Sequence, residues 1–144
     1  MSCPVGSVIC GSKEFIDQAR KWRKMVGGGM RQAGILAAAG LVALDTMIER
    51  LAEDHANARR LAEGLANIDG LEVDPESIQS NIVIFQVDPS VATAQELITA
   101  LDRQGVKMGS PGKGSIRMVT HRHITGGDVE EALSRVSKTV KEKR

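Results

Sequence analysis

The pattern of hydrophobic and polar positions predicts a helical N-terminal half and a mixed C-terminal half. A β-rich run at residues 5–10 predicts one short strand, which would need partner strands elsewhere in a larger sheet. Ser12 is a good N-cap for a helix over residues 13–25, in which Phe15 and Trp22 share one face. The basic residues of this helix lie on its other faces, which is typical of a solvated surface.

A long helical region is predicted over residues 30–66, bent or broken near Asp45 and Thr46. Residues 33–44 are apolar all round, which predicts a helix buried on all sides. This run is well short of the roughly 20 residues that span a bilayer, and no signal peptide is evident. The second half is amphipathic, and we interpret His55 on its apolar stripe as a packing residue rather than a ligand.

The C-terminal half changes to a mixed pattern of strands and helices. Residues 81–87 are β-branched and aromatic, which predicts a strand. A capping box opens a helix over residues 93–104, and residues 106–108 and 115–120 read as a hairpin around a Gly-Ser-Pro-Gly-Lys-Gly turn. A second cap at residues 125–128 begins the closing helix. The sequence therefore predicts an α+β fold, with helices packed on a small antiparallel or mixed sheet.

Composition and charge narrow the function classes. Aromatic residues make up only 2% of the chain, and its formal net charge is +1. Neither base-stacking platforms nor a strong field are present, so we expect no nucleic-acid or membrane partner. Cys3 and Cys10 are seven residues apart on one predicted strand and would face opposite sides, so we expect them to stay unpaired in a reducing cytoplasm.

Three consecutive glycines at residues 27–29 are followed closely by Arg31, at the start of the long run of helix-forming residues. Backbone amides and a helix N-terminus attract anions, and an arginine there adds donors suited to phosphate or carboxylate. The alternative reading of the triplet is a flexible joint between two helices.

Five strings of residues follow one another along nearly the whole chain. They are Pro4-Val5-Gly6-Ser7, Arg20-Lys21-Trp22-Arg23-Lys24-Met25, Gly27-Gly28-Gly29-Met30-Arg31-Gln32, Glu53-Asp54-His55-Ala56-Asn57-Ala58 and Ile116-Arg117-Met118-Val119-Thr120-His121. In this order and spacing they closely resemble the low-specificity L-threonine aldolases. These are pyridoxal-phosphate (PLP) enzymes of the aspartate-aminotransferase-like fold, fold type I.

The resemblance implies that the chain is the C-terminal part of such an enzyme. In the family, a Ser-Lys-Gly-Leu-Gly segment precedes the string at Pro4, and its lysine carries the cofactor as a Schiff base. That lysine would fall just ahead of residue 1, so we expect the isolated chain to be inactive and to bind no PLP alone. The resemblance implies three segments. Residues 1–29 are the end of the large cofactor domain and contain one orphan strand of it, residues 30–70 are long connecting helices, and residues 71–144 are a small C-terminal α+β domain.

The resemblance also suggests which residues form the site. Arg117 lies between apolar residues of a predicted strand, where a surface position is the default, but the matching family segment supplies the arginine that binds the substrate α-carboxylate. Arg31 is implied to contact the cofactor phosphate, in a neighbouring subunit, with Lys24 as an accessory cation. No catalytic residue is identified. His121 and His123 have no carboxylate or cysteine arranged around them, so we expect no metal site.

The implied reaction cleaves the Cα–Cβ bond of threonine or allo-threonine to glycine and acetaldehyde. The partners expected are an amino-acid substrate, the missing large domain, and further copies in a homo-oligomeric dimer or tetramer. Two alternatives stay open: a non-catalytic oligomerisation module derived from this fold, and a piece of another fold type I enzyme that acts on a related amino acid.

Overall fold

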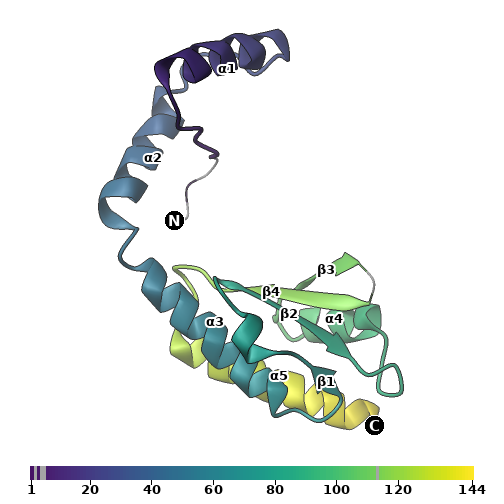
Figure 1. Ribbon diagram of the computed structural model, residues 1–144. Coiled ribbons are helices and arrows are strands. Elements are labelled where there is room, and N and C mark those ends of the chain that lie inside the picture. The colour runs from purple at the N-terminus through teal and green to yellow at the C-terminus, as the bar shows by residue number, and fades with distance from the viewer. Residues whose placement is uncertain (2, 4–5, 113) are drawn as a thin grey trace. The chain divides into compact units, whose positions relative to one another are not determined.

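The computed structural model describes residues 1, 3, 6–112 and 114–144, and its contacts divide the chain into two compact units. The first unit is Met1–Ile48 and the second is Glu49–Arg144, and each is described by itself. Figure 1 shows the first unit in purple and blue and the second from teal to yellow. The division at residue 48 falls inside the predicted connecting segment 30–70.

The first unit contains the helices α1 (Lys13–Met25) and α2 (Gly34–Thr46). The predicted N-cap is confirmed, because the Ser12 side chain accepts a hydrogen bond from the Phe15 N–H. The predicted strand at 5–10 is wrong over residues 6–10, which are not in a strand, and Val5 lies outside the described residues. A strand needs a neighbour with which to exchange backbone hydrogen bonds, and the described part of this unit provides none.

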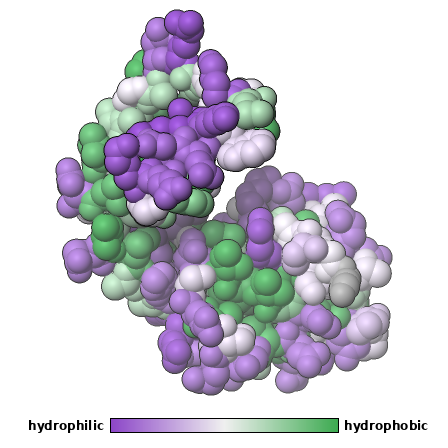
Figure 2. Space-filling model, turned by 45° about the horizontal axis from the view of Figure 1, so that its top comes forward, coloured by the Kyte–Doolittle hydropathy of each residue, from purple (hydrophilic) through white to green (hydrophobic). Residues whose placement is uncertain are grey.

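Helix α2 departs from its prediction in two ways. It begins at Gly34 rather than at Met30, and of its residues only Ala43 is buried. Ile35 is 80% exposed and Leu41 62% exposed, so the expectation of burial on all sides is wrong for the chain by itself. Figure 2 shows green, hydrophobic side chains along this unit. The apolar surface of α2 has the character of a buried helix without the cover that would bury it.

The second unit packs three helices on one face of a four-stranded antiparallel sheet with strand order β1-β2-β4-β3 (Figure 1). The strands are β1 (Leu71–Glu72), β2 (Ile82–Val87), β3 (Gly109–Gly112) and β4 (Ser115–Val119), and the helices are α3 (Leu51–Ala66), α4 (Ala94–Asp102) and α5 (Gly126–Lys143), with a short 3-10 helix at Pro75–Ser77. The prediction of an α+β fold is confirmed.

Alternation along the central strands explains why only one sheet face is covered. Val83, Phe85 and Val87 of β2 are buried while the residues between them are exposed. Ile116 and Met118 of β4 are buried in the same way. Successive side chains on a strand point to opposite faces, so the helices cover the face that these residues share. Gly64 allows α3 to approach α5 closely, since a Cβ there would overlap the Leu133 side chain.

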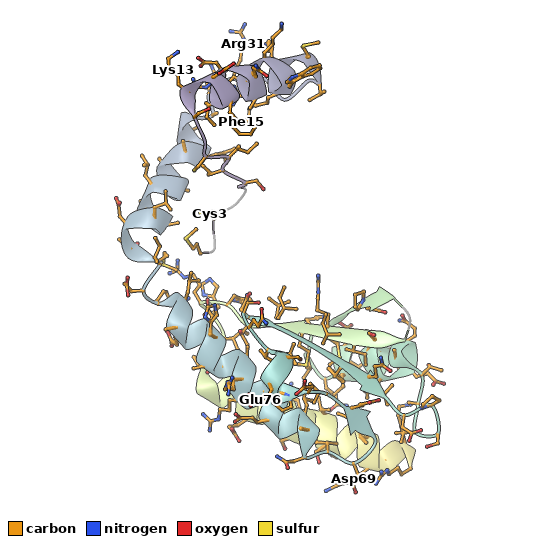
Figure 3. All side chains as sticks on the ribbon, viewed as in Figure 1. Cys3, Lys13, Phe15, Arg31, Asp69 and Glu76 are labelled. Carbon is orange, nitrogen blue, oxygen red and sulfur yellow. The ribbon has the colours of Figure 1, made fainter. Side chains whose placement is uncertain are left out.

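Both predicted helix caps of the second unit are confirmed. Thr93 and Glu96 form a capping box at the start of α4, and Thr125 and Asp128 form another at the start of α5. These hydrogen bonds lower the pKa of the Glu96 and Asp128 carboxyl groups, chiefly through donors on Thr93 and Thr125. Figure 3 labels Asp69 near the C-terminal end of α5, where the Arg144 guanidinium lies 3.4 Å from its carboxylate.

The hairpin is confirmed in its second strand, β4, but its first strand lies further along the chain than predicted. The prediction placed its first strand at residues 106–108, whereas β3 occupies Gly109–Gly112, inside the expected turn. The reason is that Val106 closes the C-terminal end of α4: its N–H donates to the Leu101 carbonyl and its side chain packs in the core. This N–H is therefore not free to donate to a neighbouring strand.

The long helical region is interrupted where the sequence indicated. Helix α2 ends at Thr46 and α3 begins at Leu51, which confirms the predicted break. His55 is exposed on α3, so its interpretation as a packing residue is wrong. No helix in the described part of the chain combines the length and apolarity needed to cross a membrane.

Candidate functional site

Arg117 lies in the middle of β4, on the sheet face that no helix covers. Its cross-strand neighbours are Ile84 of β2 and Gly109 of β3. Its side chain is exposed, whereas Ile116 and Met118 on either side of it are buried. The predicted alternation is therefore confirmed.

The surface around Arg117 is apolar. The exposed large hydrophobic side chains described in the second unit are Ile82, Ile84 and Val119, and Ile82 pairs with Val119 across the strands. We call these three residues and Arg117 the outer sheet face. Figure 2 shows a green area on the surface of this unit that faces the viewer. Covering such a surface strengthens the attraction between a guanidinium and a carboxylate because less water screens the pair, but it also removes hydration from both groups.

The glycine triplet ends helix α1 with a Schellman motif. The Gly28 N–H donates to the Arg23 carbonyl at 2.7 Å, and the Gly27 N–H donates to the Lys24 carbonyl at 3.2 Å. Gly27 has a φ of +86°, which favours glycine. Two of the three glycine amides are therefore committed to helix carbonyls, and the idea that the triplet supplies free amides to an anion is wrong for these two.

Lys24 and Arg31 both belong to the first unit. The Lys24 side chain lies over Gly29, because a Cβ at that glycine would be 2.9 Å from Nζ. Arg31 is exposed in a bend ahead of α2, next to Gln32, whose φ of +51° is left-handed. Figure 3 labels Arg31 in this unit, with Lys13 and Phe15 of α1. Arg117 lies in the other unit and is described with that unit alone.

Arg31 precedes the first turn of α2, whose N-cap Ala33 gives no side-chain hydrogen bond. The first N–H groups of a helix have no intrahelical partner and carry the positive end of its dipole. An exposed arginine beside such a turn provides donors that suit a phosphate. The residues present therefore fit a contribution to phosphate binding.

A cluster of polar residues at the start of α3 was not singled out from the sequence as a set of interacting groups. The Asp54 carboxylate is buried and accepts two hydrogen bonds from the Arg50 guanidinium, at 3.0 and 3.1 Å. These bonds to Asp54 raise the pKa of Arg50. One turn further along, the Asn57 side chain donates to the Ile124 carbonyl at 2.9 Å. The sequence signal for this cluster was the spacing of Asp54 and Asn57, which lie three positions apart beside the apolar stripe of α3.

The described residues give no support for a metal centre at His121 and His123. The His123 N–H donates to Nδ1 of His121, and the two rings meet edge to face at 5.8 Å between centroids. No group of three or more His, Cys, Asp or Glu side chains that could hold a metal occurs within residues 1, 3, 6–112 and 114–144.

The fold is that of fold type I PLP enzymes. A NifS-like protein matches 79% of this chain with a TM-score of 0.65 and 17% identity, over 35% of its own length. A mutant of C-DES with glycine covalently linked to its PLP cofactor matches 73% of the chain with a TM-score of 0.61 and 23% identity, over 28% of its length. At these identities the likeness concerns the fold alone.

The family follows from residues 1–88, which match the model of the beta-eliminating lyases, and the chain belongs to that family. Among curated proteins it is similar to low-specificity L-threonine aldolase 1 of Arabidopsis thaliana, 42% identical over 93% of the chain. It is also similar to the low specificity L-threonine aldolase of Escherichia coli K12, 39% identical over the same share. The chain spans 38% of the length of each of these relatives.

Proposed function

We propose that this chain is part of a PLP-dependent threonine aldolase that cleaves threonine or allo-threonine to glycine and acetaldehyde. The observation that carries the proposal is its identity of 39–42%, over 93% of its length, to enzymes that bear this name. PLP, when bound, provides an electron sink for the electrons of the broken Cα–Cβ bond.

Arg117 is proposed to bind the substrate α-carboxylate. Its guanidinium is exposed on the outer sheet face, opposite a glycine that leaves space beside it. A planar guanidinium can donate two parallel hydrogen bonds to a carboxylate and so fix the orientation of the amino acid as well as its charge.

Arg31 is proposed to donate to the cofactor phosphate together with the first turn of α2, and Lys24 to add positive charge nearby. Arg31 and Lys24 are exposed in the same unit, which supports these roles. The lysine that binds PLP and the base that removes the β-hydroxyl proton are not assigned to any of these 144 residues. We therefore expect no aldolase activity from the chain by itself.

We further propose that the enzyme works as a homo-oligomer in the cytoplasm. The exposed apolar surface of α2 supports association, and the free thiols of Cys3 and Cys10 suit a reducing compartment. The three-part division at residues 29/30 and 70/71 also stays a prediction.

A hybrid enzyme tests the function directly. The 144 residues replace the matching segment of the Arabidopsis relative, and glycine release from threonine is measured with PLP present. We expect cleavage well above that of the Arabidopsis relative from which the matching segment has been deleted. A hybrid that folds and shows the absorption of bound PLP, yet releases no glycine, would contradict the proposal.

A further inference from the structure

The residue that follows β4 is fixed by all three of its polar groups. The Thr120 hydroxyl donates to the Asp54 carbonyl of α3 at 2.7 Å, and its N–H donates to the Asn81 carbonyl at 3.0 Å. Its own carbonyl accepts from the Asn81 side chain at 2.6 Å. Thr120 is only 1% exposed, so the hydroxyl has no access to water as a substitute partner.

The turn after Thr120 is fixed to the same helix at its other end. Asn57 donates to the carbonyl of Ile124, and the Ile124 N–H donates to the His121 carbonyl at 2.7 Å. Asp54 and Asn57 are three residues apart on α3 and so lie on one face of it. The start of α3 thus contacts both ends of the segment 120–124.

The start of α3 also contains a buried ion pair. Arg50 binds both carboxylate oxygens of Asp54, whose side chain is only 4% exposed. This pair lies within the turn of α3 whose Asp54 carbonyl accepts from Thr120. The strings around Asp54 and Arg117, separate in the sequence, meet through these hydrogen bonds.

Strand pairing fixes β4 within the sheet. On one side β4 pairs with β2 in regular antiparallel register, with Ile84 opposite Arg117. On the other side it pairs irregularly with β3, an exposed strand that contains two glycines. The Thr120 hydroxyl, in contrast, joins the end of β4 to α3. Two-point binding of a carboxylate tolerates little displacement, so the position of β4 matters.

We propose that Thr120 is a positioning residue for Arg117. Its hydrogen bond to the Asp54 carbonyl fixes the position of the C-terminal end of β4 relative to α3. The inference rests on the proposed role of Arg117 in binding the amino-acid carboxylate. Thr120 itself faces the helices, as its burial requires, and contacts no substrate.

The chain offers a matched control in Thr139 of α5. Thr139 is 3% exposed, donates to the Arg135 carbonyl at 2.9 Å and accepts from the Gln104 side chain at 2.9 Å. Thr120→Val and Thr139→Val each replace a buried hydroxyl by a methyl group of similar size. Both variants should lose stability, but only the first removes the hydrogen bond between α3 and the residue that follows β4.

Kinetics of the hybrid enzyme give the first readout. We expect Thr120→Val to raise KM for threonine about fivefold to tenfold, which corresponds to weakening one of the hydrogen bonds from a displaced Arg117 to the carboxylate. The kcat and the PLP concentration for half activity should stay within about twofold. Thr120→Ser should restore KM, and Thr139→Val should leave it unchanged. Equal KM for the two valine variants would overturn the proposal.

Amide hydrogen exchange of the 144-residue chain gives the second readout. Thr120→Val should speed exchange at residues 115–124 about tenfold relative to α5, whereas Thr139→Val should act on α5. If Thr120→Val does not fold, Asn57→Ala, which removes the second contact, must raise KM in the same way, and an unchanged KM there also overturns the inference. If Arg117→Ala leaves KM unchanged, the proposed role of Arg117 is wrong, while the exchange data still decide whether Thr120 fixes β4.

Discussion

Arg117 and Arg31 are both exposed arginines, yet their surroundings suit different anions. Arg117 projects from a regular strand between Ile84 and Gly109, so its backbone is fixed by pairing on both sides. Arg31 lies in a bend beside the start of a helix, where backbone N–H groups can share an anion. The first arrangement suits a small carboxylate in one orientation, and the second suits a phosphate.

Substitution of each arginine in the hybrid enzyme tests these two roles separately. Arg117→Ala should lower kcat/KM for threonine by about tenfold to a few hundredfold, because a hydrogen bond to a charged group contributes roughly 1.5–3 kcal/mol. Arg117→Lys should restore little, since a point charge lacks the bidentate geometry. Arg31→Ala should instead raise the PLP concentration for half activity.

The control for this pair is Arg122→Ala, an exposed arginine in the turn after β4 that has no assigned role. It should change neither constant by more than about twofold. Equal loss of PLP affinity in the Arg117 and Arg31 variants would show that the separation of their roles is wrong.

At the scale of elements, α2 is the helix whose surface least suits exposure. Its sequence is almost entirely apolar, but Ala43 is the one residue of this helix that is buried. Ile35, Leu41 and Val42 are each at least 60% exposed. Burial of one such side chain is favourable by about 1.5–3 kcal/mol, so contact between copies is strongly favoured.

The chain should therefore self-associate. Sedimentation of a dilute sample should detect dimers or larger species, and Leu41→Lys should shift the distribution towards monomer. Gln18→Lys, which adds the same charge at an exposed position of α1, should leave it unchanged. A monomer that binds no apolar dye would contradict the expectation.

The capping boxes of α4 and α5 predict acid sensitivity. The pKa of Asp128 is lowered in the folded chain by its bonds to Thr125, so its carboxylate favours folding above the ordinary pKa of about 4. This stability is lost as pH falls through the lowered folded-state pKa. Asp128→Asn should reduce the fall in Tm between pH 7 and pH 3.

Glu63→Gln serves as the comparison, because Glu63 is an exposed carboxylate of α3 outside any cap. It should alter the pH dependence of Tm less than Asp128→Asn does. If Tm depended on pH in the same way in both variants, the capping box would not be the cause of the acid sensitivity.

At the scale of the molecule, the second unit has its own core between one sheet face and three helices. Among the described residues of the first unit, Ala43 alone is buried. The apolar surface of α2 therefore lacks cover from the described residues of its own unit.

The 144 residues alone should not become a specific PLP enzyme. After incubation with PLP and reduction with borohydride, we expect weak labelling spread over several lysines and no glycine release from threonine. The hybrid enzyme, treated in the same way, should be labelled at one site. Selective labelling of one lysine of the isolated chain, together with glycine release, would disprove this expectation.

Local chemistry was predictable from the sequence. Ser12, Thr93 and Thr125 begin helices as expected, because a cap needs only a side chain and an amide two or three residues away. The alternation around Arg117 also followed from the period of a strand. The glycine triplet and the following helix-forming run marked Arg31 as a candidate anion contact, whereas only the family resemblance distinguished Arg117 and Lys24 from surface cations.

Only the tertiary structure decided the features that depend on distant contacts. The late start of β3 follows from the use of the Val106 N–H by the end of α4, and the exposure of α2 from the lack of a covering partner. The bond from Thr120 to Asp54 joins residues that are 66 positions apart. The sequence by itself determined the capped helix starts after Ser12, Thr93 and Thr125 and the alternation of apolar positions, because these depend on neighbours along the chain. It did not determine where α2 and β3 begin. Which buried polar groups meet depends on how the elements pack, and no local pattern records it.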